Sequence, residues 1–284
     1  MTTGDYARLA MGAAGILVPL LATALIRLGR LERGRRILNF DRVSKLDVVV
    51  TTSDVRPPAI GIETDRPLTG YGQLRGVGSC TRAMSRLYRH KRISLHFSRF
   101  LRADGKLDSD LVLLGGPLKN QWSKTFLDDL VRHYEMRTFE FDEQRRNIRI
   151  DVTGFDPFEV EAFAPEMEDA RAGGLRYPKK DYGLIILSHH KGRRAGAFRW
   201  VMCAGITTYG TAAAADYLFG ELVQMPRRRA RVEAGVRSFP GKKTLMLVVE
   251  ADLSEGEVKK VSTVASFRLR RAKAVKPKKA LQPA

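Results

Sequence analysis

Apolar residues in the middle of the chain form short runs, and several runs lead into a glycine-rich turn and then a helical pattern. Leu111–Leu114 is such a run, and Gly115, Gly116 and Pro117 follow it. An amphipathic helix is predicted from about Ser123 to His133, capped by Asn120 or Ser123. The order of strand, glycine loop and helix is typical of an open α/β sheet with its loops gathered along one edge.

The same order recurs earlier and later in the chain. Strands are predicted over Leu46–Thr51 and Phe198–Ala204, with their helices over residues 73–88 and 212–223. Other strands are expected over residues 93–97 and 182–188, and 261–269 is a candidate last strand. Two hairpins are expected at the sheet edge, pairing 138–141 with 148–152 and 232–239 with 244–251.

This alternation predicts an α/β fold with a mainly parallel, open, Rossmann-like sheet, edge hairpins and one preceding transmembrane helix. We expect a membrane anchor with a basic juxtamembrane segment over residues 1–36, and a cytoplasmic α/β domain over 37–267. Residues 268–284 are expected to form a basic disordered tail. Within the domain, we expect residues 154–180 to form an excursion or lid.

The N-terminal segment carries the strongest hydrophobic signal. Leu9–Ile26 contains 18 residues without a charge, and a membrane-spanning helix needs about 20, with a range of roughly 17–25. Because arginines are retained on the cytoplasmic side, the sequence predicts a single-pass protein of the inner membrane with its C-terminal domain in the cytoplasm. Two alternatives stay open: a signal peptide cleaved near Ala22-Thr23-Ala24, and a buried or interfacial helix.

The net charge of +19 is concentrated near the two ends of the chain. Residues 27–36 contribute +4 and residues 268–284 contribute +7, which leaves +8 for the rest. We expect anionic lipid to contact Arg27, Arg30, Arg33, Arg35 and Arg36. The basic tail and residues 226–231 offer phosphate contacts, but no recognition helix or RNP-type pattern argues for nucleic acid as the main partner.

The glycine loops are the candidate binding sites. A glycine turn before a helix leaves backbone N–H groups at the positive end of the helix dipole, where phosphate binds well. We therefore expect a small phosphorylated or nucleotide-like ligand at these loops. The candidate residues are Thr52, Ser53, Gly70, Gly72, Gly115, Gly116, Asn120, Gly205, Tyr209, Gly210 and Thr211. No complete GxGxxG or GxxxxGK[ST] fingerprint occurs, so the sequence names neither the ligand nor a cofactor.

Catalytic and metal-binding patterns are weaker. The five histidines lack ligand spacing, there is no GxSxG motif, and Cys80 and Cys203 are expected to be buried free thiols. Asp54 and Asp110 are the carboxylates expected near the loops. One alternative function is therefore a nucleotide or nucleoside hydrolase or glycosidase, with Asp54 as the first catalytic candidate. Another is a structural envelope protein that self-assembles.

Two motifs carry a resemblance. LVLLGGPLKN resembles the strand–GGPxxN–helix unit of poorly characterised bacterial α/β domains, and CAGITTYGT resembles the strand–AGxxxYGT–helix unit that often accompanies it. The resemblance covers about residues 46–250 and implies a fold and a ligand pocket. More distantly, the GGP turn is similar to the strand–AGP turn of nucleoside deoxyribosyltransferases, whose loop faces a nucleoside. The acidic nucleophile of that family, with its surrounding pattern, is not evident here.

Overall fold

The computed structural model describes most of the chain. The described residues are 3–40, 45–51, 69–89, 91–99, 101, 109–142, 147–161, 167–169, 176–191, 197–225 and 244–270. For residues 3–17 the helical backbone alone is described. Thr52, Ser53, Asp54 and the predicted strand over 232–239 lie outside this set, as do the basic segment 226–231 and nearly all of the tail.

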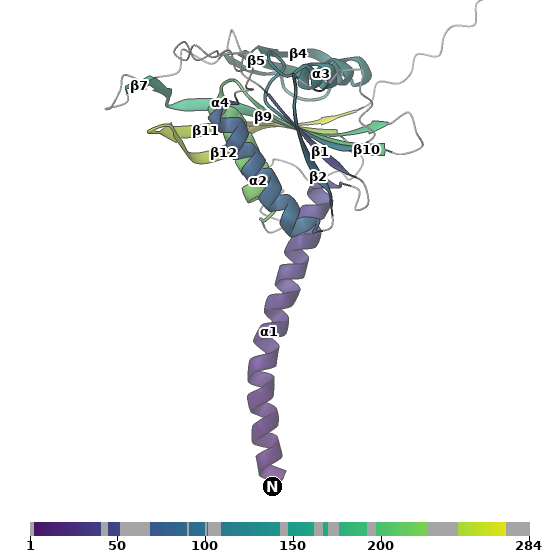
Figure 1. Cartoon of the computed structure of the whole chain (residues 1–284), viewed down its shortest axis with the longest axis vertical. Helices are drawn as coiled ribbons and strands as arrows, with labels where there is room; N and C mark the ends of the chain where they lie inside the picture. The colour runs from purple at the N-terminus through teal and green to yellow at the C-terminus, as the bar shows by residue number, and fades with distance from the viewer. Residues whose placement is uncertain are drawn as a thin grey trace, which may run out of the picture.

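A seven-stranded sheet forms the centre of the molecule, in the order β12-β11-β9-β10-β3-β1-β2 (Figure 1). Most of the predicted core strands are present, several with longer bounds than expected. The strands are β1 Leu46–Val50, β2 Ile93–Phe97, β3 Asp110–Leu114, β9 Lys180–Lys191, β10 Ala197–Gly205, β11 Thr244–Ser254 and β12 Glu257–Leu269.

The sheet is mixed, so the prediction of a mainly parallel sheet was wrong. β1 pairs in parallel with β2 and β3, and β3 pairs in parallel with β10. The pairs β9–β10, β9–β11 and β11–β12 are antiparallel. The physical reason is connection length: residues 192–196 are too few for a crossover between β9 and β10. Glu255 and Gly256, with φ angles of 55° and 73°, likewise form a tight hairpin turn between β11 and β12.

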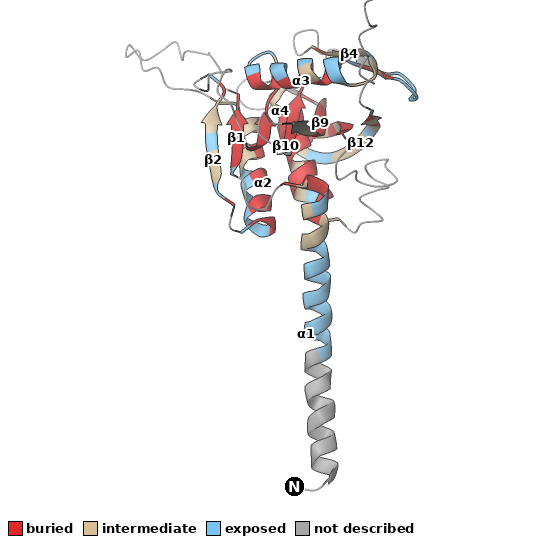
Figure 2. Ribbon diagram, turned by 90° about the vertical axis from the view of Figure 1, so that its right-hand side faces the viewer, coloured by how far each residue is buried: buried red, intermediate tan, exposed pale blue. Residues whose placement is uncertain are grey.

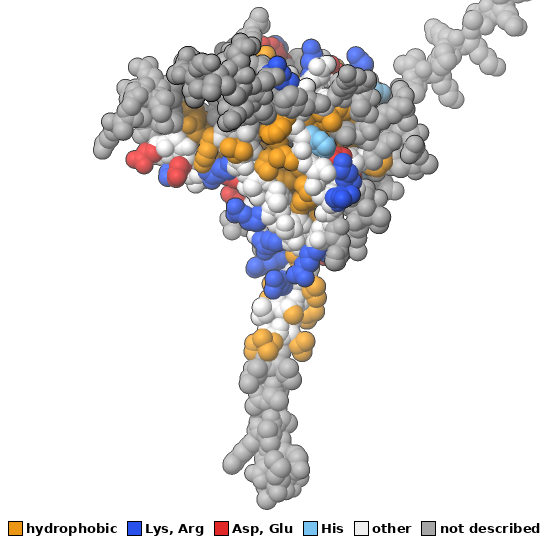
Figure 3. Space-filling view, viewed as in Figure 1, with side chains coloured by type: hydrophobic (Ala, Val, Ile, Leu, Met, Phe, Trp, Pro, Cys, Tyr) orange, Lys and Arg blue, Asp and Glu red, His pale blue; other side chains and the backbone are white. Residues whose placement is uncertain are grey.

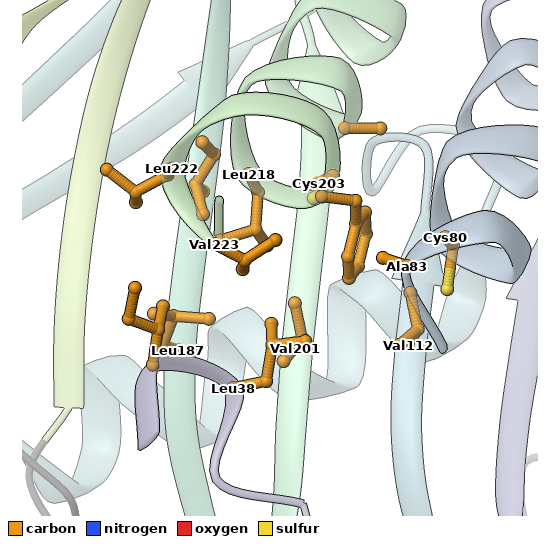
Figure 4. Packing of buried hydrophobic residues seen from close by; sticks show 14 of the residues in the cluster. Leu38, Cys80, Ala83, Val112, Leu187, Val201, Cys203, Leu218, Leu222 and Val223 are labelled. Atoms are coloured by element: carbon orange, nitrogen blue, oxygen red, sulfur yellow. The ribbon is translucent and has the colours of Figure 1, made fainter. Parts of the chain in front are cut away.

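Helices cover one face of the sheet. They are α2 (Tyr71–Leu87), α4 (Thr208–Ala215) and η1 (Asp216–Leu222), a π-helix that continues α4. Their apolar residues pack on one side of the strands in a single cluster, part of which is shown in Figure 4. Cys80 and Cys203 belong to this cluster and are buried free thiols, as predicted; burial raises the pKa of Cys80 to about 12.

The opposite face is covered by α3 (Gln121–His133) and by a small antiparallel sheet. This sheet contains β4 Met136–Asp142, β5 Asn147–Val152 and β6 Phe158–Glu161, and the short strands β7 Met167–Asp169 and β8 Arg176–Pro178 pair separately. Because both faces are covered, every residue of β1 and β3 is buried, and the sheet interior is red in Figure 2. This explains the unbroken apolar runs in the sequence.

A single helix, α1 (Thr3–Leu38), precedes the sheet and projects from the globular part of the molecule (Figures 1 and 2). Within the part of the chain that the structure describes, no helix combines the length and apolar character needed to cross a membrane. This finding contradicts the predicted transmembrane helix. α1 continues through the arginine-rich segment without a break, so the expected boundary at residue 36 falls inside the helix.

The last turn of α1 is part of the domain core. Leu38 is completely buried, and its carbonyl oxygen accepts a hydrogen bond from Nε of the buried Arg199, at 3.0 Å. Arg35 Nε donates to the carbonyl oxygen of Leu87 at 2.6 Å, and the Tyr88 hydroxyl donates to the Arg35 carbonyl at 3.2 Å. These contacts fix the end of α1 against β10 and the end of α2.

Candidate functional site

The glycine loops lie at one edge of the sheet, namely the edge formed by the carboxyl ends of its parallel strands. Because β1, β3 and β10 run parallel, their carboxyl ends at Val50, Leu114 and Gly205 point to the same edge. β9 runs in the opposite direction, so it begins at this edge. The structure thus brings the first helix start, the GGP turn and the start of α4 together, and sequence spacing predicted this grouping.

The start of α2 receives no cap from its own N-cap residue. Gly70 is its N-cap and supplies no side chain to cap the helix, and the first turn contains no acidic residue. The Gly72 amide donates to Thr208 Oγ1 at 2.8 Å, while the Thr208 hydroxyl donates to Gln73 Oε1 at 3.1 Å. Thr208 therefore caps the Gly72 amide from α4, and the first turn of α2 contains no acid to offset the positive end of the helix.

The turn at Gly115 contacts two neighbouring strands and α3 at this edge. The φ angle of Gly115, +109°, lies in the region that favours glycine, and a Cβ at this position would overlap Thr51 Oγ1. The Gly115 amide donates to the Cys203 carbonyl at 2.9 Å, and its own carbonyl accepts from Ser123 Oγ at 2.8 Å. The turn is therefore held against β1, β10 and α3 at once.

Asn120 is the buried N-cap of α3, so of the two caps that the sequence predicted, Asn120 or Ser123, the structure selects Asn120. Its Oδ1 accepts hydrogen bonds from the amides of Trp122 at 3.1 Å and Ser123 at 3.3 Å. Because two donors face this oxygen, the orientation of the side-chain amide is fixed, and the other group is the donor Nδ2. Nδ2 is buried and has no hydrogen-bond acceptor among the described residues. Such an orphaned donor is unusual in a folded protein and calls for an acceptor.

The start of α4 differs, because the protein supplies its own anion there. Asp181 Oδ2 accepts from the Thr207 hydroxyl at 2.5 Å and from the Gly210 amide at 2.6 Å. Burial raises the pKa of Asp181, and these hydrogen bonds oppose that shift. The carboxylate thus occupies the place where we expected a ligand anion to meet Gly210 and its neighbours Gly205, Tyr209 and Thr211.

Two glycines of this region have a packing role. A Cβ at Gly205 would overlap the Thr211 amide, and one at Gly210 would overlap the Tyr182 carbonyl. These glycines let α4 start directly against β9 and β10. The sequence signal that we read as ligand binding is therefore accounted for here by close backbone packing.

Sequence reasoning missed Gln73, Thr208 and Asp181. Gln73 and Thr208 connect the starts of α2 and α4, which are far apart in the chain, so no local motif marks them. Asp181 reaches α4 because β9 is antiparallel to β10, and that pairing was not predicted. A threonine pair before a helix, Thr207-Thr208, is a capping signal that could have been read.

Asp110 is not at this edge. It begins β3, so it lies at the opposite, amino-terminal end of the parallel strands. Its carboxylate is buried, 2.7 Å from Lys91 Nζ, and also accepts from the Arg199 amide at 2.9 Å. The interpretation of Asp110 as a residue near the loops is corrected: its surroundings are those of a structural ion pair.

Another carboxylate, Asp47, also lies away from the loops, on β1. Burial alone would raise its pKa, but hydrogen bonds from Lys45, Ser109 and His96 outweigh burial, so the pKa of Asp47 is lowered. Among the described residues, no group of three or more His, Cys, Asp or Glu side chains could hold a metal ion.

Comparison with known proteins adds no further constraint. No protein-family model, curated protein or solved structure matches this chain. The resemblance of the two glycine-loop motifs to bacterial α/β domains therefore stays a prediction, and functional inference depends on the geometry of the sheet edge.

Proposed function

We propose that this protein binds a small phosphate-bearing or nucleotide-like ligand at the edge where α2 and α3 begin, and acts as a sensor or effector. The observation that carries the proposal is Nδ2 of Asn120, which is buried and has no acceptor in the part of the chain that the structure describes. Asn120 lies beside the glycine turn, because its amide donates to the Gly116 carbonyl at 3.2 Å. The start of α2, whose first turn contains no acidic residue, adds the positive end of a helix dipole at the same edge. Together these groups suit a ligand rich in acceptor oxygens.

Binding is favoured over catalysis by the state of the nearby carboxylates. Asp181 is held by the first turn of α4. Asp216 accepts from Arg75 Nε at 2.5 Å and from the Ser79 hydroxyl. Both groups are engaged in structural contacts, which is unfavourable for a nucleophile or general base. A hydrolase that uses Asp54, which lies outside the described residues, stays a prediction, as does self-assembly in the envelope.

The substitution Asn120→Asp tests the binding site. Aspartate keeps the oxygen that caps α3 but removes the amide donor and adds a negative charge. We expect inorganic phosphate and adenosine 5′-monophosphate to stabilise the wild-type full chain by about 2.7 kcal/mol at 100 times the dissociation constant. Because a hydrogen bond to a charged group contributes about 1.5–3 kcal/mol, Asn120→Asp should weaken binding at least tenfold in a thermal-shift titration.

Asn147→Asp is the matched control, since it adds the same charge at the start of β5, outside the loops. Its affinity for both probes should equal that of the wild type. Equal affinities of Asn120→Asp and Asn147→Asp would contradict the assignment of Asn120, and the absence of a shift with either probe in the wild type would contradict the proposed function.

We also propose that α1 contacts an anionic lipid surface through its arginines. Arg27 and Arg30 are exposed, and Lys and Arg side chains gather where α1 leaves the globular part (Figure 3). Large apolar side chains beside them, including Leu25 and Ile26, are more than half exposed. This combination of basic and exposed apolar side chains supports a lipid partner. The cytoplasmic location stays a prediction.

Vesicle cosedimentation tests this contact. The double substitution of Arg27 and Arg30 by glutamine should weaken binding to phosphatidylglycerol vesicles about 30-fold, since each arginine near an anionic surface contributes about 1 kcal/mol. The control replaces Arg137 and Arg149, two exposed residues of the small sheet, by glutamine. Equal binding of both variants, or equal binding of the wild type to phosphatidylcholine vesicles, would refute the proposal.

A further inference from the structure

α2 and the continuous helix α4–η1 lie side by side from the candidate site to the end of α1 (Figure 1). At the site they are joined by the hydrogen bond between the Gly72 amide and Thr208 Oγ1, at 2.8 Å. At their other ends Arg86 Nη1 donates to Gln224 Oε1 at 2.7 Å. A helix of 17 residues is about 25 Å long, so the pair connects two distant regions.

The middle of the pair is joined at the junction between α4 and η1. Asp216, the first residue of the π-helix, accepts from Arg75 and Ser79 of α2. Directly beside this contact, Gly76 of α2 packs so tightly on Ala215 that a Cβ at Gly76 would lie 3.2 Å from the Ala215 Cβ. π-helical turns are rare and frequently mark functional sites. Contacts along the whole length make the two helices one packed unit.

α1 is seated on the far end of this unit. Gly34 of α1 lies between the ends of α2 and η1: a Cβ there would be 2.7 Å from Leu87 Cδ2 and 3.0 Å from the Val223 carbonyl oxygen. Arg35, the next residue, donates to the Leu87 carbonyl. The position of α1 is therefore set by the same two helices whose starts border the candidate site.

We propose that the α2/α4–η1 pair couples occupancy of the ligand site to the seating of α1, by which we mean the packing of its last turns against the ends of α2 and η1. This coupling depends on the proposed function, because it gives the bound ligand its effect. A ligand bound at this edge acts beside the Gly72–Thr208 contact, and the packed pair carries the resulting shift to Gly34 and Arg35. Coupling between two sites is reciprocal, so a change in the seating of α1 alters affinity for the ligand.

The substitution Gly34→Ala tests the reciprocal effect, with Gly29→Ala as its control. Both changes add one methyl group to α1, but a Cβ at Gly29 meets nothing within 4 Å. Adenosine 5′-monophosphate is the probe, titrated into the full chain. We expect the dissociation constant to change at least fivefold in Gly34→Ala, the lower end of usual allosteric coupling, and less than twofold in Gly29→Ala.

A second measurement needs no ligand. Amide hydrogen exchange of Asn39, whose N–H donates to the Arg35 carbonyl at 2.7 Å, reports on the seating of α1. Thr208→Ala removes the acceptor of the Gly72 amide at the distant end, and it should speed this exchange severalfold. Thr125→Ala, which removes an exposed hydroxyl on α3, should leave the exchange unchanged.

The outcomes separate the two proposals. If the probe binds Gly34→Ala and Gly29→Ala equally and Thr208→Ala leaves the exchange of Asn39 unchanged, the coupling is refuted and the binding site stands. If the probe fails to bind the wild type, the proposed function fails, and the exchange measurement alone decides whether the helix pair connects its two ends.

Discussion

Replacing Lys91 with methionine is expected to lower the free energy of unfolding by about 3–5 kcal/mol, because it breaks a buried ion pair by removing the ammonium group next to the Asp110 carboxylate. The side chains of Lys91 and Asp110 are 0% and 1% exposed, and their charged atoms are 2.7 Å apart. Lys91 Nζ also lies 5.6 Å from the centre of the Phe40 ring. Urea denaturation of the full chain gives the free energy directly.

Two further variants define the origin of this effect. Lys124→Met removes an exposed lysine of α3 and should change stability by less than about 0.5 kcal/mol. Adding Asp110→Asn to Lys91→Met should recover part of the loss, since the neutral amide needs no cation and can still accept from the Arg199 amide. Losses that simply add in the double variant would show that the two charges are not energetically coupled.

This ion pair is one part of a buried polar cluster at the amino-terminal end of the sheet. Burial lowers the pKa of Arg199 to about 10, so its guanidinium stays protonated at neutral pH. Arg199 donates to Leu38, and Lys91 lies near Phe40, so the cluster holds the end of α1. Breaking the pair should therefore also loosen α1, in addition to weakening the core.

The substitution Gly72→Ala is expected to destabilise the protein by about 2–3 kcal/mol through forced separation of α2 and α4. A Cβ at Gly72 would overlap the backbone carbonyl of Thr208, and a backbone atom cannot move aside as a flexible side chain can. The overlap outweighs the gain of about 1 kcal/mol that alanine brings to a helix interior. Thermal and urea denaturation both measure the difference.

Gly78→Ala gives the matched comparison on the same helix. Gly78 is exposed, and a Cβ there meets nothing within 4 Å, so alanine should stabilise the protein by about 0.5–1 kcal/mol. If both glycine variants were stabilised, α2 and α4 would not pack as closely as the structure shows. Gly72→Ala should also weaken ligand binding, since it displaces the start of α2.

The local structure of the candidate loops could be predicted from the sequence where the determining contacts are local. Asn120 follows a strand and a glycine turn and precedes an amphipathic helix, so its capping role was predictable. The need for glycine at position 115 follows from a turn with positive φ. In contrast, Gly72 and Gly210 are required by contacts with Thr208 and Tyr182, residues of other elements, and their packing role could not be read from neighbouring residues.

The sequence by itself determined the elements with strong periodicity or continuous apolar character: β1 and β3, the amphipathic α2 and α3, and the edge at which their loops meet. Tertiary structure alone decided the direction of β9, the filling of the α4 start by Asp181, the Lys91–Asp110 pair and the docking of Arg35 and Leu38. The physical reason is range. Periodicity and capping depend on residues a few positions apart, whereas strand order, buried ion pairs and helix contacts join residues that are neighbours only after folding.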